Sequence, residues 1–173
     1  MDTNPDHDPS KIVHVPPGGG HSFWVFGDLD IIKTTAQDTG GEMTFVETVV
    51  PPRSGPPLHI HERESESIYV LDGEVRVLAN GMDYTLPPGG FTYMPKNSVH
   101  RFENTLETSS RILLIFLPAG IEGYFTELGV EKVEGVPSPG GKPDWDLLDR
   151  VAPKYGLETV SYTHLTLPTN YSV

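Results

Sequence analysis

Proline and glycine interrupt this chain so often that only short regular elements can form. The 173 residues include 17 Pro and 18 Gly. Proline breaks strand and helix hydrogen bonding, and glycine marks tight turns. Between these interruptions lie short β-branched and aromatic runs, and residues 43–50 alternate as a half-buried strand does. The pattern predicts one all-β domain, a sandwich or barrel, with enough length to bury a core.

The overall charge excludes some partners. A net charge of -12 argues against nucleic acid and anionic membranes, because both require a positive surface. The chain has no cysteine, so disulfides and thiolate metal sites are excluded. The N-terminus lacks the basic and apolar segments of a signal peptide, and no apolar run reaches transmembrane length. These features predict a cytoplasmic protein.

Composition divides the chain into four parts. Residues 1–20 are polar and rich in Pro and Gly, which predicts a flexible arm. Residues 21–118 carry the strand patterns of the barrel, and residues 119–160 carry two apolar stripes at helical spacing. Residues 161–173 contain no Asp, Glu, Lys or Arg and resemble a translated vector or adapter tail. We therefore treat them as non-native and exclude them from functional reasoning.

Four side chains form a candidate metal site. His59 and His61 are two residues apart, so on a strand both point to one face. Glu66 follows after a polar turn, and His100 comes from a segment distant in sequence. Three imidazoles and one carboxylate suit a divalent transition metal: Fe, Mn, Ni, Co, Cu or Zn. We interpret Glu62 and Glu64 as residues that solvate the intervening loop.

The spacing of these residues resembles the two motifs of the cupin superfamily. In the first motif, His59, Ile60 and His61 are followed after four residues by Glu66 and after six more by Gly73. The leading glycine of this motif is at a different spacing here, because three residues rather than five separate Gly55 from His59. The second motif is matched by four residues: Gly89, Pro95, His100 and Asn104. Asn97 stands in place of the internal glycine of this motif. The turn can still form, because asparagine tolerates left-handed backbone angles.

This resemblance implies a fold and a ligand set. The implied fold is the cupin double-stranded β-helix, a jelly-roll barrel of two antiparallel sheets, with short C-terminal helices. The implied metal ligands are His59, His61, Glu66 and His100. The resemblance extends over about residues 20–130, and within it the run from Trp24 to Phe125 is similar to single-domain, quercetin dioxygenase-like cupins. Cupins commonly dimerise, so a homodimer is expected.

The leading functional hypothesis is a metal-dependent dioxygenase that acts on a small aromatic or enolic, flavonol-like substrate, with dioxygen as the second substrate. Glu66 is then both a ligand and the catalytic base. Five aromatic residues are candidates to line the cavity, although core packing competes with that role for each: Phe45, Tyr69, Phe91, Tyr93 and Phe102.

Two other hypotheses remain open. A non-redox cupin isomerase or lyase would use the metal to polarise a carbonyl, and a binding cupin would hold a small ligand without turnover. Arg53 and Arg101 are candidates to pair with a substrate carboxylate, but an intramolecular ion pair or a solvated position is favoured for both.

Overall fold

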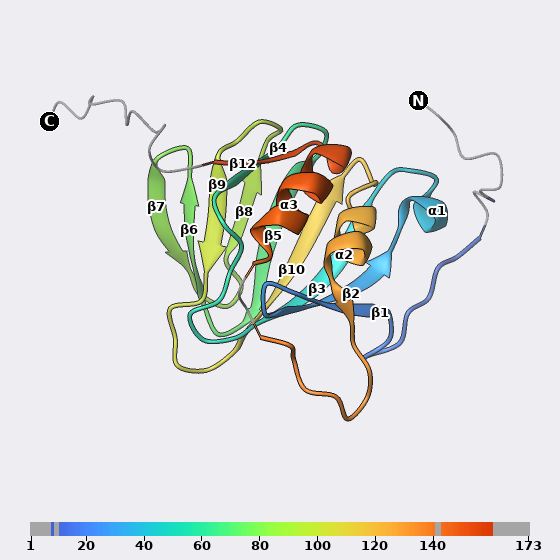
Figure 1. Cartoon of the computed structure of the whole chain (residues 1–173), viewed down its shortest axis with the longest axis horizontal. Helices are drawn as coiled ribbons and strands as arrows, with labels where there is room; N and C mark the ends of the chain where they lie inside the picture. The colour runs from blue at the N-terminus through green and yellow to red at the C-terminus, as the bar shows by residue number, and fades with distance from the viewer. Residues whose placement is uncertain (1–7, 9–10, 141–142, 161–173) are drawn as a thin grey trace, which may run out of the picture.

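The computed structural model describes residue 8, residues 11–140 and residues 143–160 (Figure 1). Within this part, the chain forms two antiparallel sheets with short helices packed at one side (Figure 1). The expected tail, 161–173, lies outside the described residues, as does most of the first half of the expected arm.

The larger sheet has seven strands and includes the first three strands of the chain. Its order is β11-β1-β2-β3-β10-β5-β8. The bounds of these strands are β11 (Val130–Glu131), β1 (His21–Val25), β2 (Asp28–Thr34), β3 (Thr44–Val50), β10 (Ser110–Leu117), β5 (Ser65–Asp72) and β8 (Phe91–Met94).

The smaller sheet has five strands in the order β12-β4-β9-β6-β7. Its strands are β12 (Leu157–Thr159), β4 (His59–His61), β9 (His100–Glu103), β6 (Val75–Ala79) and β7 (Met82–Leu86). The inward side chains of both sheets form the core, among them Val46, Ile68, Val77 and Ile112, all fully buried. The predicted all-β, jelly-roll class with short C-terminal helices is confirmed.

The helices are short and lie mainly after the barrel strands. They are α1 (Ala36–Thr39), α2 (Glu122–Leu128), α3 (Trp145–Val151) and the 3-10 turn η1 (Ala152–Tyr155). Glu122 anchors α2, because its carboxylate accepts hydrogen bonds from the Thr44 hydroxyl and from the Ala36 and Gly120 backbone amides. No helix in the described part of the chain is long and apolar enough to cross a membrane.

The apolar run from Ile112 to Leu117 predicts a strand that is buried on both faces, and the structure corrects this expectation for β10. Ile112, Leu114 and Phe116 are buried, whereas Leu113 and Ile115 are only partly covered. Only one face of this strand therefore belongs to the core.

Positive backbone angles explain several turn residues. Asn80 and Gly81 form the β6–β7 turn with φ values of 48° and 83°. Asn97 has a φ of 65°, so asparagine does adopt the left-handed conformation that the replaced glycine would supply. Gly73 has a φ of 72°, and a Cβ there would lie 2.9 Å from the Cα of Ser110, so only glycine fits this turn.

Asn104 joins the end of β3 to the loop between β9 and β10. Its side-chain amide donates to the carbonyls of Val50 and Thr108 at 2.9 and 2.8 Å, and its carbonyl oxygen accepts from the Leu106 amide at 3.0 Å. The Asn104 side chain is fully buried, and its bond to Val50 is made away from water, whereas the other two are partly buried.

Two carboxyl groups are buried in the barrel interior on β2. Asp28 and Asp30 are each 4% exposed. Burial raises the pKa of Asp28 well above its ordinary value, and the charge of Asp30 adds to this effect. Burial also raises the pKa of Asp30 to about 7, against the opposing hydrogen bond from Thr48 and with a further contribution from Glu66.

The contacts of Asn104 predict a stability loss on truncation. Asn104→Ala should lower the free energy of unfolding by about 2–4 kcal/mol, because the buried Val50 carbonyl, the partly buried Thr108 carbonyl and the Leu106 amide lose their partner. Urea denaturation measures this change. Thr85→Ala, on the exposed face of β7, is the control and should have a much smaller effect. Equal losses in the two variants would contradict this account of Asn104.

The raised pKa of Asp30 predicts a pH-dependent stability. The folded chain binds a proton at Asp30 between about pH 4 and 7 that the unfolded chain has released, so this residue makes the free energy of unfolding fall as pH rises through that range. Asp30→Asn should remove on the order of 2–4 kcal/mol of that fall. Urea denaturation at several pH values, in chelator, measures it. Asp83→Asn at the surface is the control, and identical pH profiles for Asp30→Asn and the parent protein would refute the prediction.

Candidate metal centre

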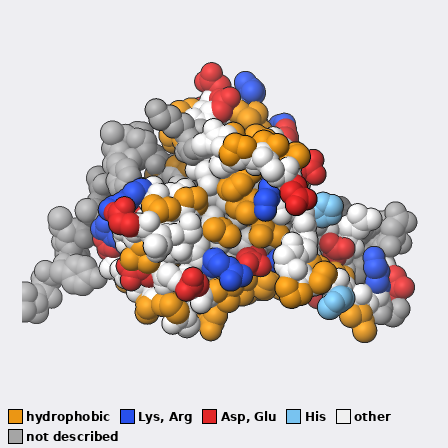
Figure 2. Space-filling view, turned by 90° about the horizontal axis from the view of Figure 1, so that it is seen from below, with side chains coloured by type: hydrophobic (Ala, Val, Ile, Leu, Met, Phe, Trp, Pro, Cys, Tyr) orange, Lys and Arg blue, Asp and Glu red, His pale blue; other side chains and the backbone are white. Residues whose placement is uncertain are grey.

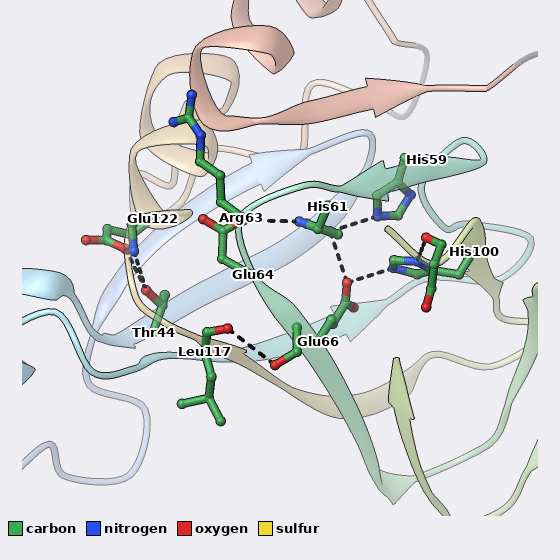
Figure 3. Close-up of polar contacts among 12 residues, drawn as sticks. Thr44, His59, His61, Arg63, Glu64, Glu66, His100, Leu117 and Glu122 are labelled. Carbon is green, nitrogen blue, oxygen red and sulfur yellow. Dashed lines mark hydrogen bonds and ion pairs between the residues drawn. The ribbon is translucent and has the colours of Figure 1, made fainter. Parts of the chain in front are cut away.

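The structure brings together the four residues of the candidate metal site. One ligand atom from each of His59, His61, Glu66 and His100 lies within 4.8 Å of the other three, and all four residues are buried (Figure 3). They are 8%, 4%, 3% and 2% exposed, respectively. The cluster is therefore shielded from bulk water.

The two sheets each contribute to the cluster. Alternation on β4 turns His59 and His61 to the same inward face. His100 lies on β9 directly opposite His59 in the antiparallel pairing. Glu66 reaches the cluster from β5 in the other sheet, after the turn that the sequence analysis expected. The site therefore lies between the sheets.

The loops beside β4 fix its position. Gly55, in the Pro-rich loop before His59, packs so close to β9 that a Cβ would lie 2.1 Å from the Phe102 carbonyl oxygen. The carbonyl of His61 accepts a hydrogen bond from the Asn97 amide at 2.8 Å, which joins β4 to the turn before His100. The loop at Gly55 and the turn at Asn97 therefore both fix the position of β4.

Backbone carbonyls set the tautomers of two histidines. The Nδ1 atom of His59 donates to the carbonyl of Pro57 at 2.8 Å, and Nδ1 of His100 donates to the carbonyl of Ser98 at 2.9 Å. We assign these protons from the carbonyl contacts. The Nε2 atom of each ring then carries a lone pair that faces the cluster.

The inward atoms are close enough to require a cation between them. Nε2 of His61 lies 3.1 Å from Nε2 of His59 and 3.1 Å from Oε2 of Glu66, and Nε2 of His100 lies 2.9 Å from the same oxygen. These are electron-rich acceptors at contact distance, so a proton or a metal ion must neutralise their repulsion. A set of three nitrogens and one oxygen fits a divalent transition metal.

The pKa shifts of His61 and Glu66 also favour a positive charge beside the carboxylate. Burial, with His100 and His61, lowers the pKa of His59 to about 3. Burial opposes charge on the other two groups as well. Even so, Glu64 and Glu66 raise the pKa of His61 to about 9, and His100 and His61 hold the pKa of Glu66 well below its usual range. The cluster therefore favours an ionised carboxylate next to a positive charge.

Glu64 was assigned the wrong environment by the sequence analysis. Glu62 is exposed as expected, but Glu64 is only 3% exposed. Its Oε2 lies 3.8 Å from Nδ1 of His61, and neither atom has a hydrogen-bond partner among the described residues (Figure 3). Glu64 thus backs the His61 ring on the side away from the cluster, where it can orient a ligand imidazole.

A largely apolar cavity adjoins the cluster. Its volume is about 50 Å³, and it is partly open to solvent. The helical segment forms one wall, with Tyr124, Phe125, Leu148 and Ala152 from α2, α3 and η1. His59, His61 and Glu66 line the same cavity, so a small molecule in it would meet the cluster directly.

The five predicted cavity aromatics are placed differently from one another. Phe102 lines the cavity, and the other four do not. Tyr69, Phe91 and Tyr93 are exposed, and Phe45 is partly buried. Because Ile68 and Val70 point inward, Tyr69 points outward. Strand patterns show which residues share a face but not which face meets the cavity, and that is why these four were misplaced.

The arginine candidates lie in ion pairs and do not line the cavity. Arg53 pairs with Glu107, and Arg101 pairs with Glu103 at 2.6 Å. The sequence analysis missed Asp28 and Asp30, which do line it. Only their position in β2, between apolar neighbours, hinted at burial.

Comparisons with known proteins agree with this geometry. Residues 46–116 match the cupin domain family. Quercetin 2,3-dioxygenase of Bacillus subtilis (strain 168) is 26% identical over 113 residues, which are 65% of this chain and 33% of that protein. An oxalate-binding protein of Thermotoga maritima is 33% identical over 73 residues, 42% of this chain and 60% of that protein. The chain thus spans about a third of the first relative and three fifths of the second.

Solved structures show the same fold. KdgF from Halomonas sp. aligns with a TM-score of 0.58 at 19% identity, over 66% of this chain and 99% of that chain. At this identity the likeness supports the fold alone. Together with the two-sheet architecture, the family match leads to one conclusion: residues 46–116 of this chain are a cupin domain.

Proposed function

We propose that this cupin is a metal-dependent oxidoreductase, a dioxygenase acting on a small aromatic or enolic, flavonol-like substrate. The observation that carries the proposal is a buried cluster of three histidines and one glutamate that opens onto an apolar cavity. The similarity to a quercetin 2,3-dioxygenase supports the same reaction class.

His59, His61, His100 and Glu66 are the residues that would hold the metal. When bound, a divalent transition metal supplies Lewis-acid polarisation of a substrate oxygen and, for a redox metal, electron transfer. Zinc and the redox metals fit the same ligands, so the ligands alone do not select the metal.

Glu66 is proposed to move the substrate proton. Its contacts with His61 and His100 go through Oε2, so Oε1 is the oxygen assigned to the substrate. The ionised carboxylate has a free lone pair on Oε1 for that proton, and the apolar walls exclude water that would compete for it.

A non-redox isomerase or lyase, or a binding protein, is the second candidate. The observation that favours it is the similarity to an oxalate-binding protein, which is 33% identical over 73 residues. The expected homodimer and the cytoplasmic location stay predictions.

Loss of one ligand should remove the metal without unfolding the barrel. His61→Ala is expected to weaken metal binding by about tenfold or more, because one of four donors is lost. Elemental analysis of protein purified without affinity resin measures metal per chain. His14→Ala, an exposed histidine outside the barrel, is the control. Metal content equal to that of the parent protein in both variants would refute the ligand assignment.

Oxygen consumption tests the reaction class. With a flavonol, catechols and β-diketones as trial substrates, an oxygen electrode should record substrate-dependent uptake by the metal-loaded protein. Uptake would support the dioxygenase. Bound metal without uptake on any substrate would favour the isomerase, lyase or binding alternatives.

Replacement of the proposed base should slow turnover more than it disturbs folding. Glu66→Gln is expected to reduce kcat by roughly 10²–10⁴-fold, because the amide cannot accept the substrate proton. Rates must be compared at equal metal occupancy, because Glu66 is also a ligand. Unchanged turnover per bound metal would exclude Glu66 as the base.

A further inference from the structure

Two buried carboxyl groups line the cavity together with the metal centre. Asp28 and Asp30 alternate on β2, so both side chains point into the barrel. The proposed chemistry at the metal centre uses neither of them. Buried carboxyls are rare unless they serve packing or a ligand, and these two face open space in the cavity.

Neutral hydroxyl groups hold both carboxyls in place. The Oδ1 atom of Asp30 accepts a hydrogen bond of 2.6 Å from Thr48, its direct neighbour on β3. Asp28 accepts a hydrogen bond from the hydroxyl of Ser54, in the loop that leads to His59. Among the described residues, neither carboxyl forms an ion pair.

Asp30 shares the cavity with residues of the metal centre and of the helical wall. His59, His61 and Glu66 line this cavity, and so does Tyr124 on α2. A ligand in the cavity can therefore contact the metal centre and Asp30 together.

The cavity offers no cation to an anionic ligand apart from the metal. None of the described residues that line it is Lys or Arg, and three of them are acidic: Asp28, Asp30 and Glu66. A negative charge on the part of the ligand away from the metal would lie in a low-dielectric space beside carboxyl groups. Its burial and its repulsion from these groups would both weaken binding.

We infer that the Asp28/Asp30 pair is the recognition end of the cavity, where Asp30 hydrogen-bonds a hydroxyl group at the far end of a small uncharged ligand whose near end reaches the metal centre. This inference rests on the proposed function of the metal site and specifies its substrate class. A hydroxyl suits Asp30 in either protonation state, because it can donate to a carboxylate and accept from a carboxylic acid. Dicarboxylates and phosphorylated compounds are selected against.

Three catechols test this inference with zinc-loaded protein, because zinc is not a redox metal and leaves them intact. All present the same two oxygens to the metal and differ only in the distal substituent: catechol has none, 4-(hydroxymethyl)catechol has a hydroxyl, and protocatechuate has a carboxylate. Isothermal titration calorimetry gives each Kd. The hydroxymethyl compound should bind about tenfold tighter than catechol, and protocatechuate about tenfold more weakly.

Variants of Asp30 assign these preferences to one residue. Asp30→Leu, of similar size, should remove both preferences while catechol binding and zinc content stay as in the parent protein. If Asp30→Leu does not fold, Asp30→Asn decides, because loss of the charge alone should restore protocatechuate binding to about that of catechol. Asp83→Asn, on the exposed part of β7, is the control and should keep both preferences.

The outcomes separate this inference from the metal site itself. Zinc bound in the protein, with equal Kd values for the three catechols or with preferences that survive both Asp30 variants, would overturn the inference and leave the metal site standing. A chain that binds no zinc in elemental analysis would overturn both.

Discussion

The repulsion among three imidazole nitrogens and one carboxylate oxygen is the constraint on which the rest of this site depends. Two backbone carbonyls hold the Nδ1 protons of His59 and His100 on the outer side, so the Nε2 lone pairs face inward, toward His61 from His59 and toward Glu66 from His100. A proton or a metal ion between these atoms relieves that repulsion. The strand register, the motif turns and the buried Glu64 all keep these atoms in place.

The segment after the barrel completes the site. Strand β12 pairs with the free edge of β4, so that Thr159 lies opposite His59 and Leu157 opposite His61. In Figure 1, α2 and α3 lie together across the side of the barrel where the cavity opens. The same segment thus supports the histidine strand and forms one wall of the cavity. On the face in Figure 2, acidic, basic and hydrophobic side chains are interspersed, and no large patch of one charge is visible among the described residues.

The sequence was sufficient for the features that local chemistry decides. Alternating runs and turn residues predicted most strands, and the spacing of His59, His61, Glu66 and His100 predicted which side chains would meet. Features that depend on packing between distant segments were not predictable. Strand β12 has three residues and no distinctive pattern, and Glu62 and Glu64 differ in burial only because of how their loop folds. The carboxyls on β2 were missed for a similar reason, since aspartate ordinarily indicates a surface position.

The most direct test of the account is the coordination of the bound metal, measured in a crystal of the metal-loaded protein by anomalous scattering at the absorption edge of that metal. The account predicts one ion per chain, bonded to an imidazole nitrogen of His59, His61 and His100 and to a carboxylate oxygen of Glu66. An ion held elsewhere, or a fully loaded protein in which any of these four side chains points away from the metal, would contradict it.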